Sequence, residues 1–293
     1  DRDRHQAYKI SLSAADQDLE IPEVTTFAGS SYGYADGTGT AAKFRFPRGI
    51  YSDGTNLYVG DVNHTIRKIV ISTGVVTTFA GSGSAGSTDA TGTSAKFKHP
   101  DGITSDGTNL YVVDQNNHTI RKIVISTGVV TTLAGSAGST GSTDGTGTSA
   151  RFHYPVGITT DGTNLYVGDS SNHKIRKIVI STGVVTTFAG SSGGFADGTG
   201  TAAKFNGPRG ITTDGTNLYV TDANNHKIRK IVISTGAVTT LAGSGSSGST
   251  DGTGTSATFN KPWGITTDGT NLYVSGIVNH LIRKIVISTG AAT

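Results

Sequence analysis

The segment Phe44-Arg45-Phe46-Pro47-Arg48-Gly49-Ile50 decides the fold, because its pattern returns along the chain at a nearly constant interval. The proline of this segment recurs at four further positions, which are Pro100, Pro155, Pro208 and Pro262. Self-similarity at a period of about 50 residues is typical of repeat architectures such as solenoids and propellers. The fold therefore depends on what one copy of the repeat forms.

One copy reads as four short strands, which in the first copy cover residues 49–52, 56–59, 65–71 and 75–80. Residues 53–55 join the first two strands and residues 72–74 join the last two, and both connections contain a glycine. Short connections of this kind close β-hairpins. No segment of the repeat shows helical periodicity. Each copy is therefore predicted to fold as a four-stranded antiparallel meander.

The third strand favours a propeller over a solenoid. Its apolar residues Ile66, Ile69, Val70 and Ile71 fall on both faces of the strand, so that both faces are expected to be buried. A propeller blade meets this condition, because each sheet packs face to face against its two neighbours. The chain is predicted to be an all-β protein, a β-propeller of four-stranded antiparallel blades.

The two ends of the repeat region predict how the ring closes. Residues 24–30 repeat the fourth strand of the first copy, residues 76–82, while the last copy stops at Thr293, where its fourth strand begins. Pairing of residues 24–30 with the last copy would complete that blade and leave no open edge. This predicts five blades, with repeat units at about 36–88, 89–143, 144–196, 197–250, and 251–293 plus 24–35.

Residues 1–23 lie outside the repeat. In this segment Tyr8, Ile10 and Leu12 alternate with polar residues, as they would in a further strand. The segment is expected to be an added edge strand or a docking arm. A sixth blade, built from residues 1–23 or from a partner chain, is the main alternative to five blades.

The composition excludes several classes of protein. With no cysteine among 293 residues the chain is not a disulfide scaffold, and no apolar run is long enough for a helix inserted in a membrane. The formal net charge of +3 indicates no dense basic patch, so nucleic acid is not an expected partner. Richness in Gly, Ser and Thr favours an extracellular, periplasmic or cell-surface location. The start at Asp1 without any methionine suggests a larger polypeptide or assembly.

The motif Asn63-His64-Thr65-Ile66, and Asn279-His280-Leu281 in the last copy, resemble the NHL-repeat family. The Pro-x-Gly-Ile and Leu-Tyr-Val-x-Asp motifs support the same resemblance over residues 24–293. In its near-identical copies the chain resembles bacterial-type members of that family. The resemblance implies a β-propeller, commonly with six blades, whereas five copies are recognisable here. Members of the family include peptide-, protein- and RNA-binding modules and a minority of metal-dependent enzymes.

Several polar residues occur once in each copy, and a structural role is expected for all of them. A metal site needs ligands that converge on one ion, and residues at one equivalent position of each blade lie around a ring instead. The aspartates that close the second strand are expected to accept hydrogen bonds in turns. The Asp-Gly-Thr-Gly-Thr loops offer a single carboxylate each, too few for calcium. The arginine of each Arg-Lys pair is expected to keep its charged group in solvent. These residues are His64, His118, His173, His226 and His280; Asp61, Asp114, Asp169 and Asp222; Asp36, Asp144, Asp197 and Asp251; and Arg67, Arg121, Arg176, Arg229 and Arg283.

No residue pattern indicates catalysis. The only glutamates, Glu20 and Glu23, precede the repeats, and every Ser, His and Asp of one copy has counterparts in most others. A hydrolase needs one nucleophile next to one base. The protein is therefore expected to be a non-enzymatic binding module without metal or cofactor. The alternatives are a metal-dependent propeller lyase or lactonase, and a structural repeat domain of a larger surface protein.

The positions at which the copies differ point to a binding face. Outside the long Gly-Ser loops, they gather around the proline and after the second strand, two places that lie at the same end of an up-and-down meander. Specific ligands need an asymmetric surface, and loops on rigid strands usually provide it. We therefore predict that a peptide, protein or glycan binds at the mouth of the central channel, where Trp and Arg are typical of binding hot spots. The predicted ligand-binding residues are Arg48, Asp101, Val156, Arg209 and Trp263 after the prolines, and Phe46, His99, Tyr154 and Lys261 before them.

Overall fold

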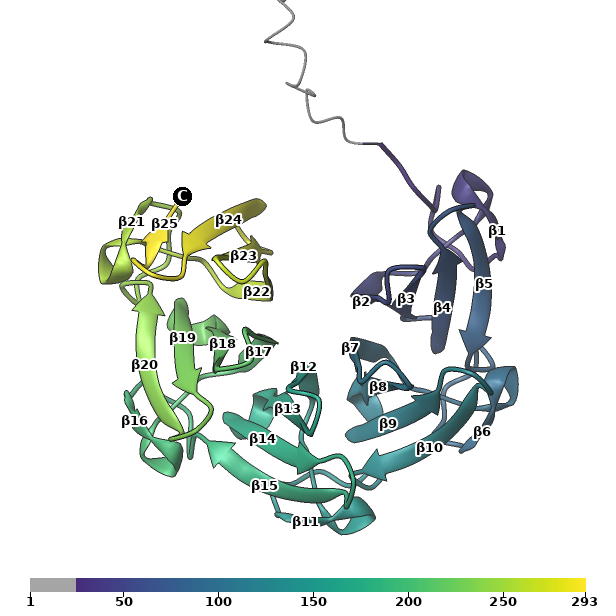
Figure 1. Ribbon diagram of the computed structural model, residues 1–293, viewed down its shortest axis with the longest axis horizontal. Helices are drawn as coiled ribbons and strands as arrows, with labels where there is room; N and C mark the ends of the chain where they lie inside the picture. The colour runs from purple at the N-terminus through teal and green to yellow at the C-terminus, as the bar shows by residue number, and fades with distance from the viewer. Residues whose placement is uncertain (1–24) are drawn as a thin grey trace, which may run out of the picture.

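A computed structural model of the protein describes residues 25–293, and its blades surround a central channel (Figure 1). The predictions for residues 1–23 lie outside the described residues. The described chain forms five antiparallel sheets, one for each copy of the repeat. The prediction of an all-β, five-bladed propeller is therefore confirmed. No helix in this part of the chain is long and apolar enough to span a membrane.

The first blade shows the plan of all five. From the channel outwards it contains β2 (Pro47–Ser52), β3 (Asn56–Asp61), β4 (Thr65–Val70) and β5 (Val75–Ala80), which match the four predicted strands. A fifth strand of two residues, β1 (Gly37–Thr38), pairs with the outer edge of β5 and leads into the 3-10 turn η1 (Gly39–Ala41). The sequence did not predict β1, because two residues are too few to show an alternating pattern.

The other four blades repeat this order. In the second blade the elements are β6 (Ala90–Thr91), η2 (Gly92–Ser94), β7 (Pro100–Ser105), β8 (Asn109–Asp114), η3 (Gln115–Asn117), β9 (Thr119–Val124) and β10 (Val129–Ala134). In the third they are β11 (Gly145–Thr146), η4 (Gly147–Ser149), β12 (Pro155–Thr160), β13 (Asn164–Asp169), η5 (Ser170–Asn172), β14 (Lys174–Val179) and β15 (Val184–Ala189).

In the fourth blade they are β16 (Gly198–Thr199), η6 (Gly200–Ala202), β17 (Pro208–Thr213), β18 (Asn217–Asp222), η7 (Ala223–Asn225), β19 (Lys227–Val232) and β20 (Ala237–Ala242). In the fifth they are β21 (Gly252–Thr253), η8 (Gly254–Ser256), β22 (Pro262–Thr267), β23 (Asn271–Gly276), β24 (Leu281–Val286) and β25 (Ala291–Ala292).

The hydrophobic core is divided among the junctions between blades. At the first junction Tyr58, Ile66 and Ala80 of blade 1 pack against Phe97 and other apolar residues of blade 2, all of them buried. The next three junctions contain the equivalent residues. Each blade therefore presents one apolar face to the blade before it and another to the blade after it, which explains why both faces of the third strand are apolar.

The predicted closure of the ring is wrong in one respect. Among the described residues, β24 pairs with β25 from the end of the chain, and no ladder joins residues 25–30 to blade 5. Residues 25–30 lie instead against blade 1, where the Gly29 amide donates a hydrogen bond to the Gly39 carbonyl oxygen (3.1 Å). In Figure 1 blade 5 and blade 1 face each other across an open sector.

Candidate ligand-binding mouth of the channel

The innermost strands pack closely around the channel because each contains a glycine. A Cβ atom on Gly102 would lie 2.6 Å from the Val156 carbonyl oxygen, and a Cβ on Gly49 would overlap the Asp101 carbonyl oxygen. Gly157 and Gly210 meet the next inner strand in the same way. Real side chains do not fit into such gaps, so the Pro-x-Gly-Ile motif carries glycine to bring the inner strands together.

A β-bulge next to each proline positions the mouth residues. In blade 1, Pro47 pairs with Asp61 and Ile50 with Val59, so that Arg48 and Gly49 together oppose a single residue, Gly60. The same shift in register follows Pro100, Pro155, Pro208 and Pro262. Bulges bend a strand and redirect its side chains. Of the five residues that follow the prolines, Arg48, Asp101, Val156 and Trp263 line the central pocket, whereas Arg209 is not among the lining residues. Their role in binding stays a prediction.

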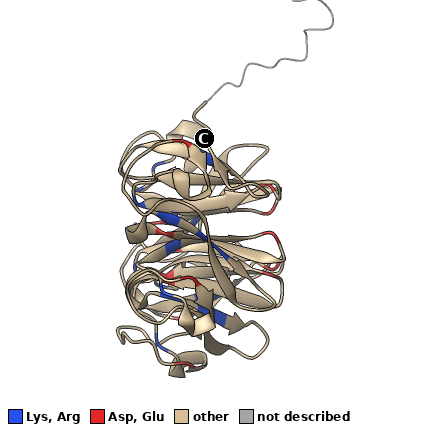
Figure 2. Ribbon diagram, turned by 90° about the vertical axis from the view of Figure 1, so that its left-hand side faces the viewer, with Lys and Arg blue, Asp and Glu red and all other residues tan. Residues whose placement is uncertain are grey.

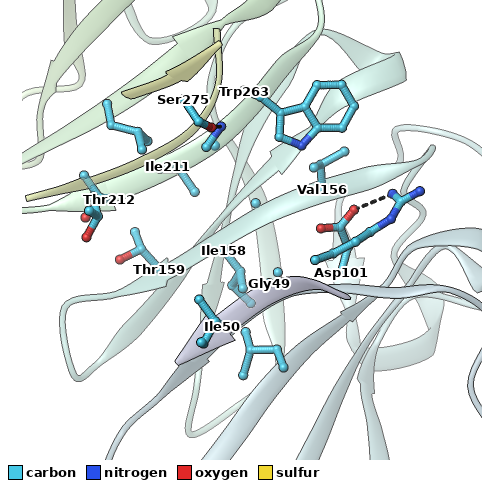
Figure 3. Close-up of a pocket in the computed structure, with 18 of the residues that line it drawn as sticks. Gly49, Ile50, Asp101, Val156, Ile158, Thr159, Ile211, Thr212, Trp263 and Ser275 are labelled. Atoms are coloured by element: carbon cyan, nitrogen blue, oxygen red, sulfur yellow. Dashed lines mark hydrogen bonds and ion pairs between the residues drawn. The ribbon is translucent and has the colours of Figure 1, made fainter. Parts of the chain in front are cut away.

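The pocket at the mouth has a volume of about 770 Å³ and is lined by the inner strands of all five blades. Figure 3 shows Trp263, Val156 and Asp101 towards one end of this pocket and Thr159 and Thr212 towards the other. The sequence analysis did not select the wall residues, such as Ile158, Thr159 and Thr212. They belong to an inner strand whose sequence after the proline is nearly the same in every copy, so no difference between copies marks them.

Arg48 and Asp101 form an ion pair across the first junction. Arg48 Nη1 lies 2.9 Å from Asp101 Oδ2 and 3.2 Å from Gln115 Oε1. Asp101 is almost fully buried, and burial raises the pKa of its carboxyl group, although the hydrogen bond and charge of Arg48 act in the opposite direction. Arg48 therefore supports a buried carboxylate as well as lining the mouth.

Arg209 and Trp263 form a second pair, at the fourth junction. The Arg209 guanidinium lies over the Trp263 ring, 3.7 Å from its centroid, which is a close cation–π contact. Burial lowers the pKa of Arg209; the charge of Asp101 opposes this shift and the charge of Arg48 adds to it. Among the described residues the only side-chain contact of the guanidinium is the Trp263 ring, and Trp263 itself lines the pocket.

The predicted rim residues Phe46, His99, Tyr154 and Lys261 lie directly above the junctions. All four have left-handed backbone, with φ between 47° and 55°, and Gly207 takes the same position in blade 4. This conformation costs energy for residues other than glycine and persists where surrounding contacts require it. Phe46 and Tyr154 are strongly exposed aromatic rings next to the mouth. Their positions fit the predicted face, while their role in binding stays a prediction.

A histidine from the preceding blade holds the left-handed residue in four of the five blades. The Nδ1 atom of His118 accepts a hydrogen bond from the Tyr154 amide of the next blade (3.2 Å). His64, His173 and His226 accept equivalent bonds from residues 99, 207 and 261. The expected structural role is confirmed for these four histidines, because each one links two blades. Burial lowers the pKa of His64, His118 and His226, which keeps them neutral and able to accept.

The expectation that the arginine of each Arg-Lys pair keeps its charged group in solvent is wrong. Arg121 is fully buried; its Nη1 lies 3.0 Å from Asp114 Oδ2 and its Nη2 lies 2.7 Å from Asp89 Oδ1. Arg67, Arg176 and Arg229 repeat both ion pairs, and Arg283 repeats the outer one. The aspartates of the Asp-Gly-Thr-Gly-Thr loops are thus partners of arginine. The pairing of each buried arginine with two aspartates could not be predicted from the sequence, because the two carboxylates come from distant parts of the repeat.

The aspartates that close the second strands accept turn hydrogen bonds, as predicted. Asp61 Oδ1 accepts from the amides of Arg45 (3.0 Å) and Asn63 (3.1 Å). These bonds hold the segment before the proline against the segment after the second strand, which places both variable segments at one end of the blade. Across residues 25–293 no three His, Asp or Glu side chains converge into a metal-ligating group.

The other end of the propeller differs from the mouth. There the β2–β3 turn is the same in every blade, and Asp53 Oδ1 accepts hydrogen bonds from the amides of Thr55 (2.8 Å) and Asn56 (2.6 Å). Figure 2 shows acidic residues in turns along this edge of the molecule. The differences between blades are therefore concentrated at the mouth.

Comparison with curated proteins shows similarity along most of the chain. It is 31% identical over 280 residues to the protein SUPPRESSOR OF QUENCHING 1, chloroplastic, of Arabidopsis thaliana, a match that covers 88% of this chain and 26% of that protein. It is 29% identical over 305 residues to NHL repeat-containing protein 2 of Homo sapiens, covering 90% of this chain and 42% of that protein. The chain spans less than half the length of these relatives. No protein-family model matches the sequence.

Solved structures share the fold. A chain in the crystal structure of a nidogen/laminin complex has a TM-score of 0.61 and 18% identity, and the match covers 84% of this chain and 78% of that chain. An auxiliary nutrient binding protein from Bacteroides thetaiotaomicron VPI-5482 has a TM-score of 0.56 and 20% identity, with coverages of 89% and 75%. At these identities the likeness extends to the fold alone.

Each of the five repeats forms one blade and carries the Asn-His motif or a close variant, and the similarity to a protein named for the NHL repeat covers 90% of the chain. The chain is similar to NHL-repeat proteins along most of its length, and its described residues have the β-propeller fold that its repeat motifs predict.

Proposed function

We propose that the protein is a non-enzymatic binding module that captures an acidic segment of a protein or peptide at the channel mouth. The observation that carries this proposal is the Arg209 guanidinium, stacked on Trp263, which itself lines the pocket. Arginine binds carboxylates through two parallel N–H donors, and such charge-assisted bonds strengthen where water is excluded. The stacking on Trp263 holds the guanidinium in place before a ligand arrives.

The surroundings of Arg209 support a macromolecular ligand. Phe46 and Tyr154 expose aromatic surface at the rim, next to the wide loop face formed by five different blade ends. Exposed aromatic and arginine side chains around a partly buried centre are typical of protein-binding surfaces. The ionisable residues that line the pocket are Arg48, Asp101, Tyr51 and Tyr273, a set without a nucleophile next to a base. This lining supports binding rather than hydrolysis.

Trp263 is the only tryptophan of the chain and serves as a built-in probe. Titration with poly-L-glutamate in 0.15 M salt is expected to change its fluorescence in a saturable way, and poly-L-lysine is expected to leave it unchanged. Arg209→Gln removes the cation and is expected to weaken binding by about tenfold or more, as for loss of a charged hydrogen bond. Arg151→Gln removes the same charge from a side chain that does not stack on Trp263 and serves as the matched control.

The result decides between ligand classes. A response to polygalacturonate but not to poly-L-glutamate would assign the mouth to acidic glycans. Equal losses in the Arg209→Gln and Arg151→Gln variants would show that net charge alone drives binding, and would reject the mouth. Arg48 is unsuitable for this test, because its removal leaves the buried Asp101 without its ion-pair partner.

We also propose that the protein acts outside the cytoplasm, as its composition suggests. An anionic polymer or an acidic surface protein would be accessible to it there. Recovery of the protein only in the cytoplasmic fraction of its source cells would reject this location and leave the binding proposal standing.

A further inference from the structure

The open sector between blade 5 and blade 1 exposes two surfaces that are buried at every other junction. Ile282 of blade 5 is 71% exposed, whereas the equivalent Ile66, Ile120, Ile175 and Ile228 are 0% exposed. Ile50 of blade 1 is 61% exposed, whereas Ile103 is 7% exposed. These two faces are the two halves of the repeated junction, and the described residues leave both without a partner blade.

The backbone at the open sector shows the same lack of a partner. The Cβ position of Gly264 meets only Ser275 Oγ of its own blade, at 3.0 Å, whereas its four equivalents meet the backbone of the next inner strand. His280 receives no amide hydrogen bond from a described residue, in contrast to His64, His118, His173 and His226. The sector thus lacks the contacts that one further blade would make.

Residues 25–30 already occupy the position of one strand of that blade. They correspond to the end of β5, and the bond from the Gly29 amide to the Gly39 carbonyl oxygen (3.1 Å) repeats the bond from Gly81 to Gly92 (3.1 Å). Ala28 packs against the core of blade 1, just as Ala80 packs against blade 2. Within the described chain, residues 25–30 have no strand on their other edge.

We propose that the open sector is a binding site for a three-stranded segment of this same repeat, which forms a sixth blade with residues 25–30 as its fourth strand. The existing junctions define the occupant. Its first strand carries Pro-x-Gly-Ile towards blade 5, and its third strand, Ile-Arg-Lys-Ile, pairs with residues 25–28 in the register seen between β4 and β5. The inference is independent of the function of the mouth.

A second copy of the chain fits this site less well. Its first four blades already have complete fourth strands, β5, β10, β15 and β20, at the edge that residues 25–30 would need. Its blade 5 has only the short β25 at that edge, but the face of blade 5 that would have to pack in the sector is already covered by its own blade 4. The proposed occupant must lack that strand. A partner segment with three strands of the repeat would therefore cover the exposed apolar faces of blades 5 and 1 and pair with the free edge of residues 25–30.

The test uses a peptide that covers residues 197–236, which contains three main strands of blade 4 and lacks β20. Added to the full chain, it is expected to form a one-to-one complex in sedimentation analysis. Hydrogen exchange is expected to slow at the amides of residues 25–28. The same peptide with Ile228→Asp, which places a charge on the face towards blade 1, is the matched control and is expected not to bind.

Gly264→Ala provides the second arm of the test. Its Cβ has room in the open sector, but it would overlap the inner strand of a bound sixth blade, as at Gly102 and Gly157. The variant is expected to fold normally and to bind the peptide at least about tenfold more weakly, as expected for overpacking. If the peptide binds the parent chain and the Gly264→Ala variant with equal affinity, or binds neither, the proposal is overturned.

The same experiment separates the other occupants. Concentration-dependent dimerisation that the peptide does not inhibit would assign the faces to a second copy and overturn the proposal. Binding that occurs only after residues 1–24 are removed would assign the sector to those residues, with the same consequence.

If the free peptide aggregates, a second copy of residues 240–290 joined directly after Thr293 continues the repeat in phase. This fusion is expected to raise the unfolding temperature of the chain, and Gly264→Ala is expected to abolish the gain. An unchanged unfolding temperature in the parent fusion would overturn the proposal.

Discussion

At the scale of the residue, the buried arginine of each blade is the most consequential side chain outside the mouth. Arg121 joins β9 to Asp114 at the end of β8 and to Asp89 at the outer edge, and it lies over the Phe97 ring, 5.0 Å from the centroid. Burial raises the pKa of Asp114 to about 6, although hydrogen bonds from Asn117 and Arg121 oppose the shift. The charges of Arg121 and Asp114 depend on each other, because both side chains are buried away from water.

Arg121→Met is therefore expected to lower the free energy of unfolding by about 3–5 kcal/mol, since it leaves the Asp114 carboxyl group buried without its counter-ion. Lys122→Met, at the adjacent and partly exposed position, is expected to change it by less than about 0.5 kcal/mol. Urea unfolding of both variants measures the difference. Similar midpoints for the two variants would show that the ion pair is dispensable.

At the scale of the element, the inner strand combines a proline, a bulge and a glycine within three positions. In β7 the proline and bulge turn Asp101 to the mouth, and Gly102 lets β12 approach. The same motif in β22 has no following blade in the described chain, so its glycine lies next to open space on that side. One sequence motif thus occurs in two packing environments within one molecule.

The two environments predict opposite effects of one substitution. Gly102→Ala is expected to destabilise the protein by about 1–3 kcal/mol, because its Cβ would be 2.6 Å from the Val156 carbonyl oxygen. Gly264→Ala is expected to stay within about 0.5 kcal/mol of the parent. Thermal unfolding followed by circular dichroism measures both. Equal destabilisation would mean that the glycine is needed for backbone conformation and not for the approach of a neighbouring blade.

At the scale of the whole molecule, the blades are joined by repeated junctions, each with an apolar core and a histidine hydrogen bond. A protonated Nδ1 cannot accept the amide, so these bonds require neutral histidine. Burial, followed by the charges of His153 and Lys98, lowers the pKa of His118 below its usual value of 6.5. The stabilisation from this neutral histidine is therefore fully present above pH 6.5 and is lost as the pH falls through the lowered folded value.

His118→Asn isolates this effect, because asparagine tolerates the left-handed backbone (φ 59°) and does not titrate. The parent is expected to be more stable than the variant by about 1 kcal/mol at pH 8, the typical contribution of one hydrogen bond. The difference is expected to shrink as the pH falls below 6.5. Chemical unfolding at pH 8 and pH 5 measures it, and a difference that grows on acidification would contradict the proposed role of the neutral ring.

Much of this protein was determined by the sequence alone, because strands, turns and blade number depend on local patterns repeated five times. The up-and-down order of the strands also predicted which end of the molecule carries the segments that differ between the copies. Only the tertiary structure decided that Arg121 is buried, that Arg209 lies on Trp263, and that blade 5 and blade 1 stay apart. These features arise where segments distant in the sequence meet, within one repeat for Arg121 and between blades for the other two. Whether the ring closes depends on the rotation from each blade to the next, summed over all junctions. The sequence of one repeat does not reveal this sum.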